Sequence, residues 1–376
     1  MQVAYCGPIA AKGQPARGGY EAANRRLVDD LRARGIEVQE YPYALTGGAT
    51  PIKTIGYLAG FVRIAAQLII DRARWDILHL TPLYKQFLYA EAVLCRLTWM
   101  LGKRVVLDIR AGAFLHYYAG RGRLYQATID HLIRRAEMVA VEGEEYLPFA
   151  TARHHGHVLY LPNYVSAAPL APQPGDRQPS PVRLVYLGRV VSQKGIETAI
   201  GTLAALLARG VDARLEVIGT GDPDYIGALK AACNGLPVIW AGALPPAKVA
   251  EHIRGAHVFL FPTDHLSEGH SNALTEAMAQ GLVPVCSDNG FNRSVVGDAG
   301  RILPVSAVAE DYANAIVDIG TGSNWRTLSQ RAHQRVSERF TSDVVLPALI
   351  QGYRAASAPA ATDSSDSMTT ITGRLY

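Results

Sequence analysis

The sequence predicts an α/β protein made of two doubly wound domains with parallel sheets. Short apolar, β-branched runs alternate with longer helical patterns from one end of the chain to the other. Runs without strict polar alternation are typical of parallel strands covered on both faces. A stretch rich in proline and alanine interrupts this rhythm near the middle of the chain. The 376 residues are enough for two domains of ordinary size.

We assign the first domain to residues 1–165. Apolar residues at helical spacing predict its helices, and apolar runs between turn residues predict its strands. In chain order the predicted strands are QVAYCG, EVQEYPY, WDILHLTP, RVVLDIR, EMVAVEG and HVLYLPN. The predicted helices cover residues 20–34, 52–70, 85–101 and 124–135.

Residues 166–181 have the composition of a linker, and we assign the second domain to residues 182–340. Its predicted strands are VRLVYLG, ARLEVIG, PVIWAG, HVFLFPT, VPVCSD and RILPV. Its predicted helices cover residues 196–209, 224–233, 246–254, 272–280, 308–319 and 324–340. A last helix is expected over residues 344–356. The polar tail, residues 359–376, is expected to be disordered.

Composition places the chain among globular proteins, with 49% hydrophobic and 19% charged residues. Cys6, Cys95, Cys233 and Cys286 form no CxxC pair, so we expect buried free thiols in a reducing compartment. The N-terminus lacks a basic segment followed by a long apolar run, and we therefore expect no signal peptide and a cytoplasmic location.

The first domain is basic and the rest of the chain is not. Residues 1–165 carry 20 Lys and Arg against 14 Asp and Glu, whereas the remainder carries 17 against 19. This asymmetry indicates an acidic lipid head group or a phosphate-bearing substrate, with solvated helix faces as the alternative. Nucleic acid is not expected, because the basic residues are scattered and no aromatic-plus-basic motif occurs.

The most apolar stretch, Ile52–Ile70, is interrupted by Lys53 and Arg63 and is therefore too short a clean span to cross a membrane. Two interpretations stay open. It is either a buried or partly buried domain helix, or a helix lying on a membrane surface, at the inner face of the membrane.

Ligands of open parallel sheets bind beyond the carboxyl ends of the strands, so the loops after strands are the informative ones. In LVYLGRVVSQKGIE, Gly188 allows close backbone approach, and Arg189 and Lys194 offer donors suited to phosphate oxygens. Two surface cations in an ordinary loop are the alternative interpretation.

A second loop carries EGHSNALTE. Ser271 is a good N-cap, which places Glu268 in the loop and Glu276 about one turn inside the helix. Carboxylates accept hydroxyls well, so a molecule with sugars on both sides of a phosphate fits. A dipole-complementing acid and a solvated helix residue are the alternatives. The helix start also presents free backbone donors, from Asn272, Ala273 and Leu274.

A third loop, GPIAAKGQPARGGYE, is made basic by Lys12 and Arg17, and it ends in Gly18 and Gly19, directly before a helix. These glycines allow a charged group to approach the helix start closely. The loop lacks the GxGxxG spacing of a dinucleotide site.

Two patterns resemble metal sites, and neither is expected to bind a metal. GTGDPD contains an Asp-x-Asp, but an N-cap role for Asp222 or Asp224 is simpler. His265 and His270 flank Glu268 without a third ligand, so they are a poor zinc site.

Taken together, the GR…KG pair at Gly188–Gly195, the run EGHSNALTEAMAQGLVPV and the LPNYV turn resemble the retaining GT-B glycosyltransferases of family 4. The Glu-x7-Glu motif is the hallmark of that family. The resemblance implies a Rossmann-like acceptor domain, a Rossmann-like donor domain and a deep cleft between them. It also implies a final helix, residues 341–358, that crosses back to the first domain.

The resemblance further implies a UDP- or GDP-sugar donor, a hydroxyl acceptor in glycolipid, polysaccharide or other glycoconjugate biosynthesis, and no metal. Arg189 and Lys194 would bind the diphosphate, Glu276 the ribose and Glu268 the transferred sugar. Gly18 and Gly19 match the glycine loop of the first domain. The remaining donor-binding residues would be Gly188, Gly219, His270, Ser271, Asn272, Ala273 and Leu274.

The chain departs from the family after the predicted fourth strand, where many members carry a His-Asp pair. Here the sequence is LDIRAGAF, and we expect Asp108, Arg110 and the more distant His116 to line the cleft. Rival interpretations are a GT-B sugar-nucleotide epimerase, a glycoside hydrolase using Glu268 and Glu276, and a two-domain binding protein of periplasmic type.

Overall fold

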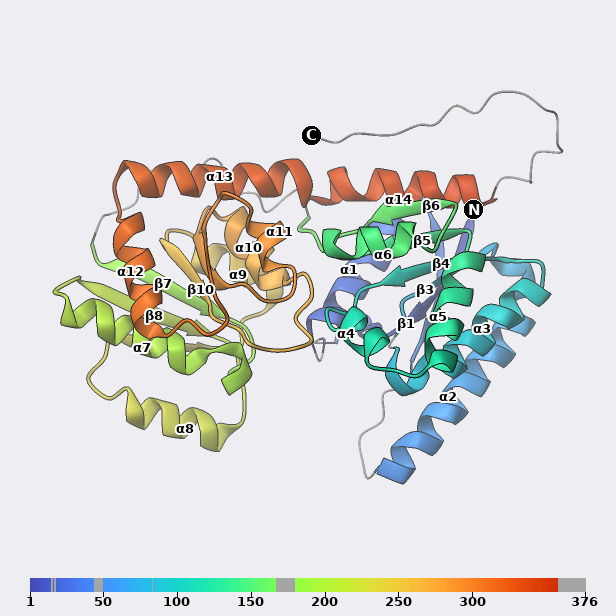
Figure 1. The fold of residues 1–376 in the computed structure, drawn as a ribbon, viewed down its shortest axis with the longest axis horizontal. Helices are drawn as coiled ribbons and strands as arrows, with labels where there is room; N and C mark the ends of the chain where they lie inside the picture. Colours follow the sequence, from blue (N-terminus) through green and yellow to red (C-terminus); the bar gives the residue numbers. More distant parts are fainter. Residues whose placement is uncertain (15, 17, 44–49, 83, 167–179, 358–376) are drawn as a thin grey trace.

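A computed structural model describes residues 1–357 apart from residues 15, 17, 44–49, 83 and 167–179. Two six-stranded sheets, all parallel, stand side by side with helices on their faces (Figure 1). The first sheet has the order β2-β1-β3-β4-β5-β6 and the second the order β12-β11-β10-β7-β8-β9. The predicted pair of doubly wound α/β domains is therefore confirmed. Most of the predicted linker and the whole predicted tail lie outside the described residues.

The first domain closely follows the apolar runs of the sequence. Its strands are β1 (Gln2–Gly7), β2 (Glu37–Pro42), β3 (Ile77–Leu80), β4 (Arg104–Ile109), β5 (Met138–Val141) and β6 (His157–Tyr160). Its helices are α1 (Gly19–Ala33), α2 (Thr50–Ile70), α3 (Leu88–Met100), α4 (Phe114–Ala119), α5 (Arg123–Arg135) and α6 (Leu147–Thr151). The sequence missed α4 and α6 because five or six residues are too few to show a helical period.

The second domain restarts the same alternation. Its strands are β7 (Val182–Leu187), β8 (Ala213–Ile218), β9 (Val238–Gly242), β10 (Val258–Phe261), β11 (Val283–Ser287) and β12 (Arg301–Leu303). Its helices are α7 (Ile196–Ala208), α8 (Pro223–Ala232), α9 (Pro246–Ile253), α10 (Asn272–Ala279), α11 (Asn292–Val296), α12 (Ala309–Ile319) and α13 (Ser323–Arg339). Each predicted helix agrees with its observed counterpart to within one residue at either end, and α11 was missed.

Strand order reverses once in each sheet, between β1 and β3 in the first and between β7 and β10 in the second. Such a topological switch point opens a crevice beyond the carboxyl ends of the strands, where ligands of this class of sheet bind. The loops after β1, β3, β7 and β10 therefore hold the positions from which a ligand is contacted.

The last helix, α14 (Ser342–Ser357), belongs to the core of the first domain. The chain crosses between the domains at Val165 and again at Thr341, and these residues form an isolated parallel bridge. Figure 1 shows α13 over the second domain and α14 continuing over the first. Leu346 and Leu349 of α14 are fully buried in the same apolar cluster as Val3 of β1.

Helix α2 is buried on one side only. Phe61, Ile64 and Leu68 belong to the core, whereas an outer face remains exposed. That face carries Ile55, Leu58, Val62, Ile69 and Ile70. Figure 1 shows α2 projecting from the body of the first domain. Among the described residues, helices are too short or too polar to span a bilayer.

The four cysteines are buried and unpaired, as the sequence predicted. Each is fully or almost fully inaccessible to solvent, so they contribute as small apolar side chains.

Candidate active site at the domain seam

The predicted site residues of both domains meet where the loops of the two sheets face each other, a region we call the seam. Gly112 of the first domain approaches so closely that a Cβ there would overlap the carbonyl oxygen of Glu268. Gly19 of the first domain accepts a hydrogen bond from Asn272 of the second through its carbonyl oxygen, at 3.0 Å. The sequence placed these residues in separate loops, and the fold brings the loops into contact.

Lys194 and Glu268 form an ion pair at the centre of the seam. Only 7% of the Glu268 side chain is exposed, and Thr263 donates a second hydrogen bond to the same carboxylate oxygen at 3.2 Å. Asn289 stabilises the loop after β10, because its side chain donates hydrogen bonds to the carbonyl oxygens of Thr263 and His265 at 3.2 and 3.0 Å. The carboxylate is therefore fixed in position and neutralised.

Two glycines let the ends of β7 and β8 touch. Gly188 and Gly219 have φ of 155° and 144°, and a Cβ on Gly219 would overlap the Gly188 carbonyl oxygen. Arg189 follows directly and is exposed. Burial lowers the pKa of His265, and the charges of Lys194 and Arg189 lower it further. These cations therefore lie near each other on the second-domain side of the seam.

Helix α10 begins as predicted, with Ser271 as its N-cap. The Ser271 hydroxyl accepts a hydrogen bond from the Leu274 backbone N–H at 3.4 Å, and Gly281 with φ of 72° follows the C-cap. The first-turn N–H groups of Asn272 and Ala273 have no acceptor within the helix. Because Asn272 contacts Gly19, the starts of α1 and α10 face each other, and two helix N-termini create a positive potential suited to an anion.

The ring of His270 is buried and engaged within the protein, and the assignment of this residue to the donor site stays a prediction. Its Nε2 lies 2.7 Å from the Thr275 hydroxyl, its ring packs edge-on against Phe340, and burial lowers its pKa to about 3. The first domain holds its peptide groups. Asn163 donates to the His270 carbonyl oxygen at 2.7 Å, and the His270 N–H is hydrogen-bonded to Glu142.

Glu276 is partly exposed and forms an ion pair. Its carboxylate pairs with Arg26 on α1 of the first domain, with 3.1 Å between the nitrogen and oxygen atoms. Arg26 also donates to the backbone carbonyl oxygen of Tyr164, near the end of the first domain. Nothing in the local sequence around Arg26 indicated this pairing, since α1 shows only the ordinary amphipathic pattern.

Asp108 lies beneath the seam, which corrects the expectation that it lines a cleft. It is fully buried and accepts hydrogen bonds from Arg110 at 2.5 Å and from His79 at 3.1 Å. Burial alone would raise the pKa of Asp108, but Arg110 and His79 hold it below its usual value. Arg110 also donates to the Asn163 side chain at 2.9 Å.

Arg110 and His116 have different surroundings. The second terminal nitrogen of Arg110, Nη2, is buried without a hydrogen-bond partner in the described part of the chain. His116 is exposed on α4, with its ring 6.3 Å from that of Tyr117.

Glu142 is a seam residue that the sequence analysis missed. It follows β5 directly and is almost fully buried, and Gly269 lies against one of its carboxylate oxygens. Burial raises the pKa of Glu142 to about 8, although Arg110 and the His270 N–H act in the opposite direction. A carboxylate directly after the buried run MVAV, at the carboxyl edge of a sheet, was the signal that could have identified it.

The structure describes the surroundings of the two sequence patterns that resemble metal sites. Asp222 caps α8, accepting hydrogen bonds from the N–H groups of Asp224 and Tyr225 at 3.0 and 3.1 Å, which is the simpler of the two interpretations. Within the described ranges, His, Cys, Asp and Glu side chains do not gather in groups of three or more that could hold a metal.

Comparison with known proteins gives a family-model match and several curated relatives in sequence. Residues 181–321 match the family model of glycosyl transferases group 1. Over 204 residues, 52% of this chain, the sequence is 33% identical to phosphatidyl-myo-inositol mannosyltransferase of Mycolicibacterium smegmatis, of which 52% is covered. It is 26% identical over 181 residues to the capsular polysaccharide biosynthesis glycosyltransferase CapM of Staphylococcus aureus, covering 45% of this chain and 44% of that one. The chain spans about half the length of these curated relatives.

The fold is shared more widely than the sequence. Sucrose-phosphate synthase from Thermosynechococcus elongatus superposes with a TM-score of 0.70 at 20% identity, over 94% of this chain and 98% of that one. HepE of Anabaena in complex with UDP gives 0.68 at 13% identity, over 94% and 100%. At these identities the likeness shows the fold alone, and it confirms the two-domain GT-B arrangement.

Proposed function

We propose that this chain, whose residues 181–321 belong to the glycosyl transferases group 1 family, is a retaining glycosyltransferase. It moves a hexosyl unit from a nucleotide-diphosphate sugar to a hydroxyl acceptor. The observation that carries the proposal is the Lys194–Glu268 ion pair beside the start of α10, because it joins a phosphate-binding cation to a sugar-binding acid.

Breaking the anomeric C–O bond leaves negative charge on the departing diphosphate and positive charge on the sugar ring. Arg189, Lys194 and the first-turn N–H groups of α10 are placed to stabilise the leaving group, which is electrostatic catalysis by preorganised donors. When the diphosphate takes Lys194, the Glu268 carboxylate is released to accept hydroxyls of the transferred sugar. In this proposal the Lys194–Glu268 ion pair forms in the free protein and is replaced when the donor binds.

Glu276 accepts the ribose hydroxyls in this proposal, through the oxygen that Arg26 does not use. Gly188 leaves room for the backbone to approach the nucleotide, and Gly18 does the same from the first domain. Gly219 lets the end of β8 pack against the Gly188 carbonyl oxygen, and Gly19 lies against the Asn272 side chain. These assignments follow the family motif residue by residue. The geometry supports them because Gly18, Gly19, Gly188 and Glu276 follow strands at the switch points of the two sheets, and Gly219 follows the neighbouring strand β8.

The relatives support the substrate classes. One solved neighbour holds UDP, and the names of the curated relatives specify a phosphatidylinositol and a capsular polysaccharide. We propose a UDP- or GDP-sugar as donor and a glycolipid, polysaccharide or other glycoconjugate as acceptor. The exposed apolar face of α2 supports peripheral association with the inner face of a membrane, in a cytoplasmic protein.

Of the two rival activities, the hydrolase fits the site less well. A glycoside hydrolase needs two carboxyl groups but no phosphate-binding cations, whereas here Lys194 pairs with Glu268 and Arg189 lies nearby. An epimerase would use the same donor loops without any acceptor.

The test is nucleotide release from UDP- and GDP-sugars, measured with and without a panel of glycan and glycolipid acceptors. Transfer is expected with one donor base, and Arg189→Ala should lower kcat/KM by about a hundredfold, as loss of one oxyanion donor does elsewhere. Lys248→Ala, an exposed cation on α9, is the matched control. Acceptor-independent isomerisation of the sugar would show an epimerase instead.

A further inference from the structure

The loop after β3 has a strained backbone at the switch point of the first sheet. Tyr84 and Lys85 have φ of 45° and 54°, and among the described residues they alone adopt positive φ without being glycine. Side chains with a Cβ rarely adopt this region, and consecutive examples persist where the surrounding contacts impose them. Such strain is a reason to ask what the two side chains do.

The strained turn buries Tyr84 and ties the loop to the donor side of the seam. Its ring packs edge-on against Phe114 and Tyr117, with centroids 6.0 and 5.3 Å apart. Its hydroxyl is hydrogen-bonded to Ser267, the neighbour of Glu268. Lys85 directly follows Tyr84, and Tyr84 contacts the loop that carries Glu268, the residue proposed to bind the sugar.

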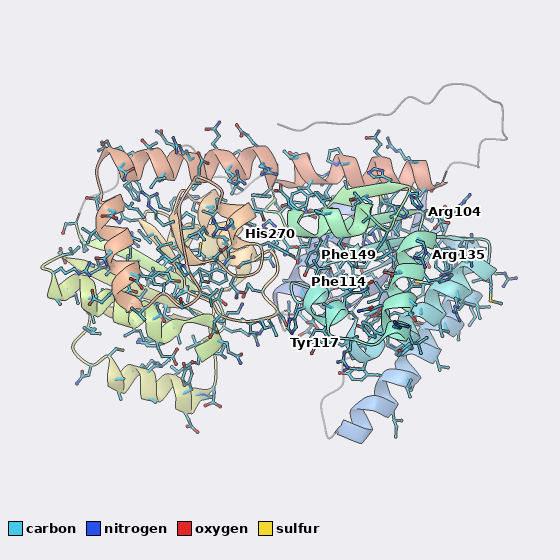
Figure 2. All side chains as sticks on the ribbon, in the orientation of Figure 1. Arg104, Phe114, Tyr117, Arg135, Phe149 and His270 are labelled. Atoms are coloured by element: carbon cyan, nitrogen blue, oxygen red, sulfur yellow. The ribbon has the colours of Figure 1, made fainter. Side chains whose placement is uncertain are left out.

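Two cations share one aromatic ring beside this turn. The Lys85 ammonium lies 4.6 Å from the centre of the Tyr117 ring and 5.5 Å from that of Tyr84. The Arg121 guanidinium lies 5.4 Å from the same Tyr117 ring. Figure 2 labels Tyr117 where the first domain faces the second. The ring therefore presents both positive charges at the seam.

These cations differ from three others near the seam in forming no ion pair with an acid, a property that they share with Arg189 among the described residues. Arg26, Arg110 and Lys194 pair with Glu276, Asp108 and Glu268 respectively. Within the described part of the chain, neither Lys85 nor Arg121 forms an ion pair with a carboxylate. Two like charges beside the same ring repel each other, and an anion bound near both of them lowers that repulsion.

We infer that Lys85 and Arg121, with Tyr117 as their common platform, bind an anionic group of the acceptor, a phosphate or a carboxylate close to the hydroxyl that receives the sugar. The inference rests on the proposed function and names its acceptor class. Arg189 and Lys194 already serve the diphosphate from the second domain, so the first-domain cations are left for the other substrate.

Anion binding can be tested apart from catalysis. In an Arg189→Ala/Lys194→Ala background the donor cations are absent, and glycerol 1-phosphate and glucuronate are titrated against glycerol and glucose by calorimetry. Both anions should bind at least tenfold more tightly than their neutral counterparts. Lys85→Gln and Arg121→Gln should each abolish that preference, whereas Arg123→Gln, an exposed arginine two residues along, should leave it unchanged. Equal affinity for anion and neutral partner, or full preference in Lys85→Gln, would overturn the inference.

Lys85→Gly gives a second readout that a merely structural role would not produce. Glycine tolerates positive φ, so this variant should keep or raise Tm while losing the preference for anions. A fall in Tm together with unchanged anion binding would contradict the inference. If the wild-type protein binds neither UDP nor GDP, the proposed function has failed, and the anion titration still reports on Lys85 and Arg121.

Discussion

Arg26 of the first domain and Glu276 of the second are joined across the seam by an ion pair of 3.1 Å. The same arginine donates to the carbonyl oxygen of Tyr164, so one side chain links α1, α10 and the segment that leaves the first domain. Because Glu276 is the residue proposed to hold the ribose, the contact that joins the domains also orients part of the nucleotide site.

Replacing Arg26 should therefore weaken donor binding more than it destabilises the protein. The pair is about one-quarter exposed on each side, so its direct contribution to the free energy of unfolding is of the order of 1 kcal/mol or less. In Arg26→Gln we expect a several-fold rise in KM for the nucleotide sugar with a smaller change in kcat. Arg32→Gln on the same helix, whose partner Glu40 lies within the first domain, is the control. An unchanged KM in Arg26→Gln would argue against the proposal that Glu276 binds the ribose of the donor.

The Lys194–Glu268 pair should show strong energetic coupling, because both side chains are largely buried. Removing either partner leaves the other charge uncompensated, which costs about 3–5 kcal/mol in buried pairs. Urea unfolding of Lys194→Met, Glu268→Gln and the double variant should give a double-mutant loss well below the sum of the single losses. Strict additivity would show that the two groups do not interact in solution.

Glu142 predicts how stability depends on pH. Its folded pKa of about 8 lies above the ordinary value of a glutamic acid, because burial outweighs Arg110 and the His270 N–H, with Asp108 and Glu268 adding to the rise. The folded protein therefore binds a proton that the unfolded chain releases between about pH 4.5 and 8. The stabilisation is fully present below that window and is lost as pH rises through 8.

In thermal unfolding from pH 5 to pH 8.5, the wild type should lose stability relative to Glu142→Gln by about 1 kcal/mol per pH unit inside the window. Glu145→Gln, which removes an exposed carboxylate in the same region of the chain, should run parallel to the wild type. Parallel curves for wild type and Glu142→Gln would mean that Glu142 titrates normally.

Gly112 tests whether the seam must close for activity. A Cβ at this position would overlap the Glu268 carbonyl oxygen and backbone of the other domain. We expect Gly112→Ala to lower transfer by at least tenfold while circular dichroism stays native, since the clash lies between domains rather than inside either core. Gly122→Ala, where a Cβ has nothing within 4 Å, is the matched control. Full activity in Gly112→Ala would show that this contact is not needed for turnover.

Much of the fold was predictable because buried parallel strands leave continuous apolar runs and because caps such as Ser271 act within a few residues. The loop positions of Arg189, Lys194 and Glu268 were predictable for the same reason, since they lie in loops that follow strands, and their donor-binding roles stay a proposal. Arg26, Lys85 and Glu142 were not, because their importance arises from partners in distant segments. Asp108 was placed wrongly, since the sequence does not show that His79 and Arg110 enclose it.

The paired crossings at Val165 and Thr341 bear on how this chain can be recombined. Val165 donates to the Phe340 carbonyl oxygen at 2.9 Å and accepts from the Ser342 N–H at 3.0 Å. The first domain is thus a discontinuous module, assembled from the N-terminal half and α14. A chimaera designed to exchange acceptor specificity has to transplant both pieces together, with both junctions at this bridge. A single junction in the linker would leave the apolar face of α14 against a foreign sheet.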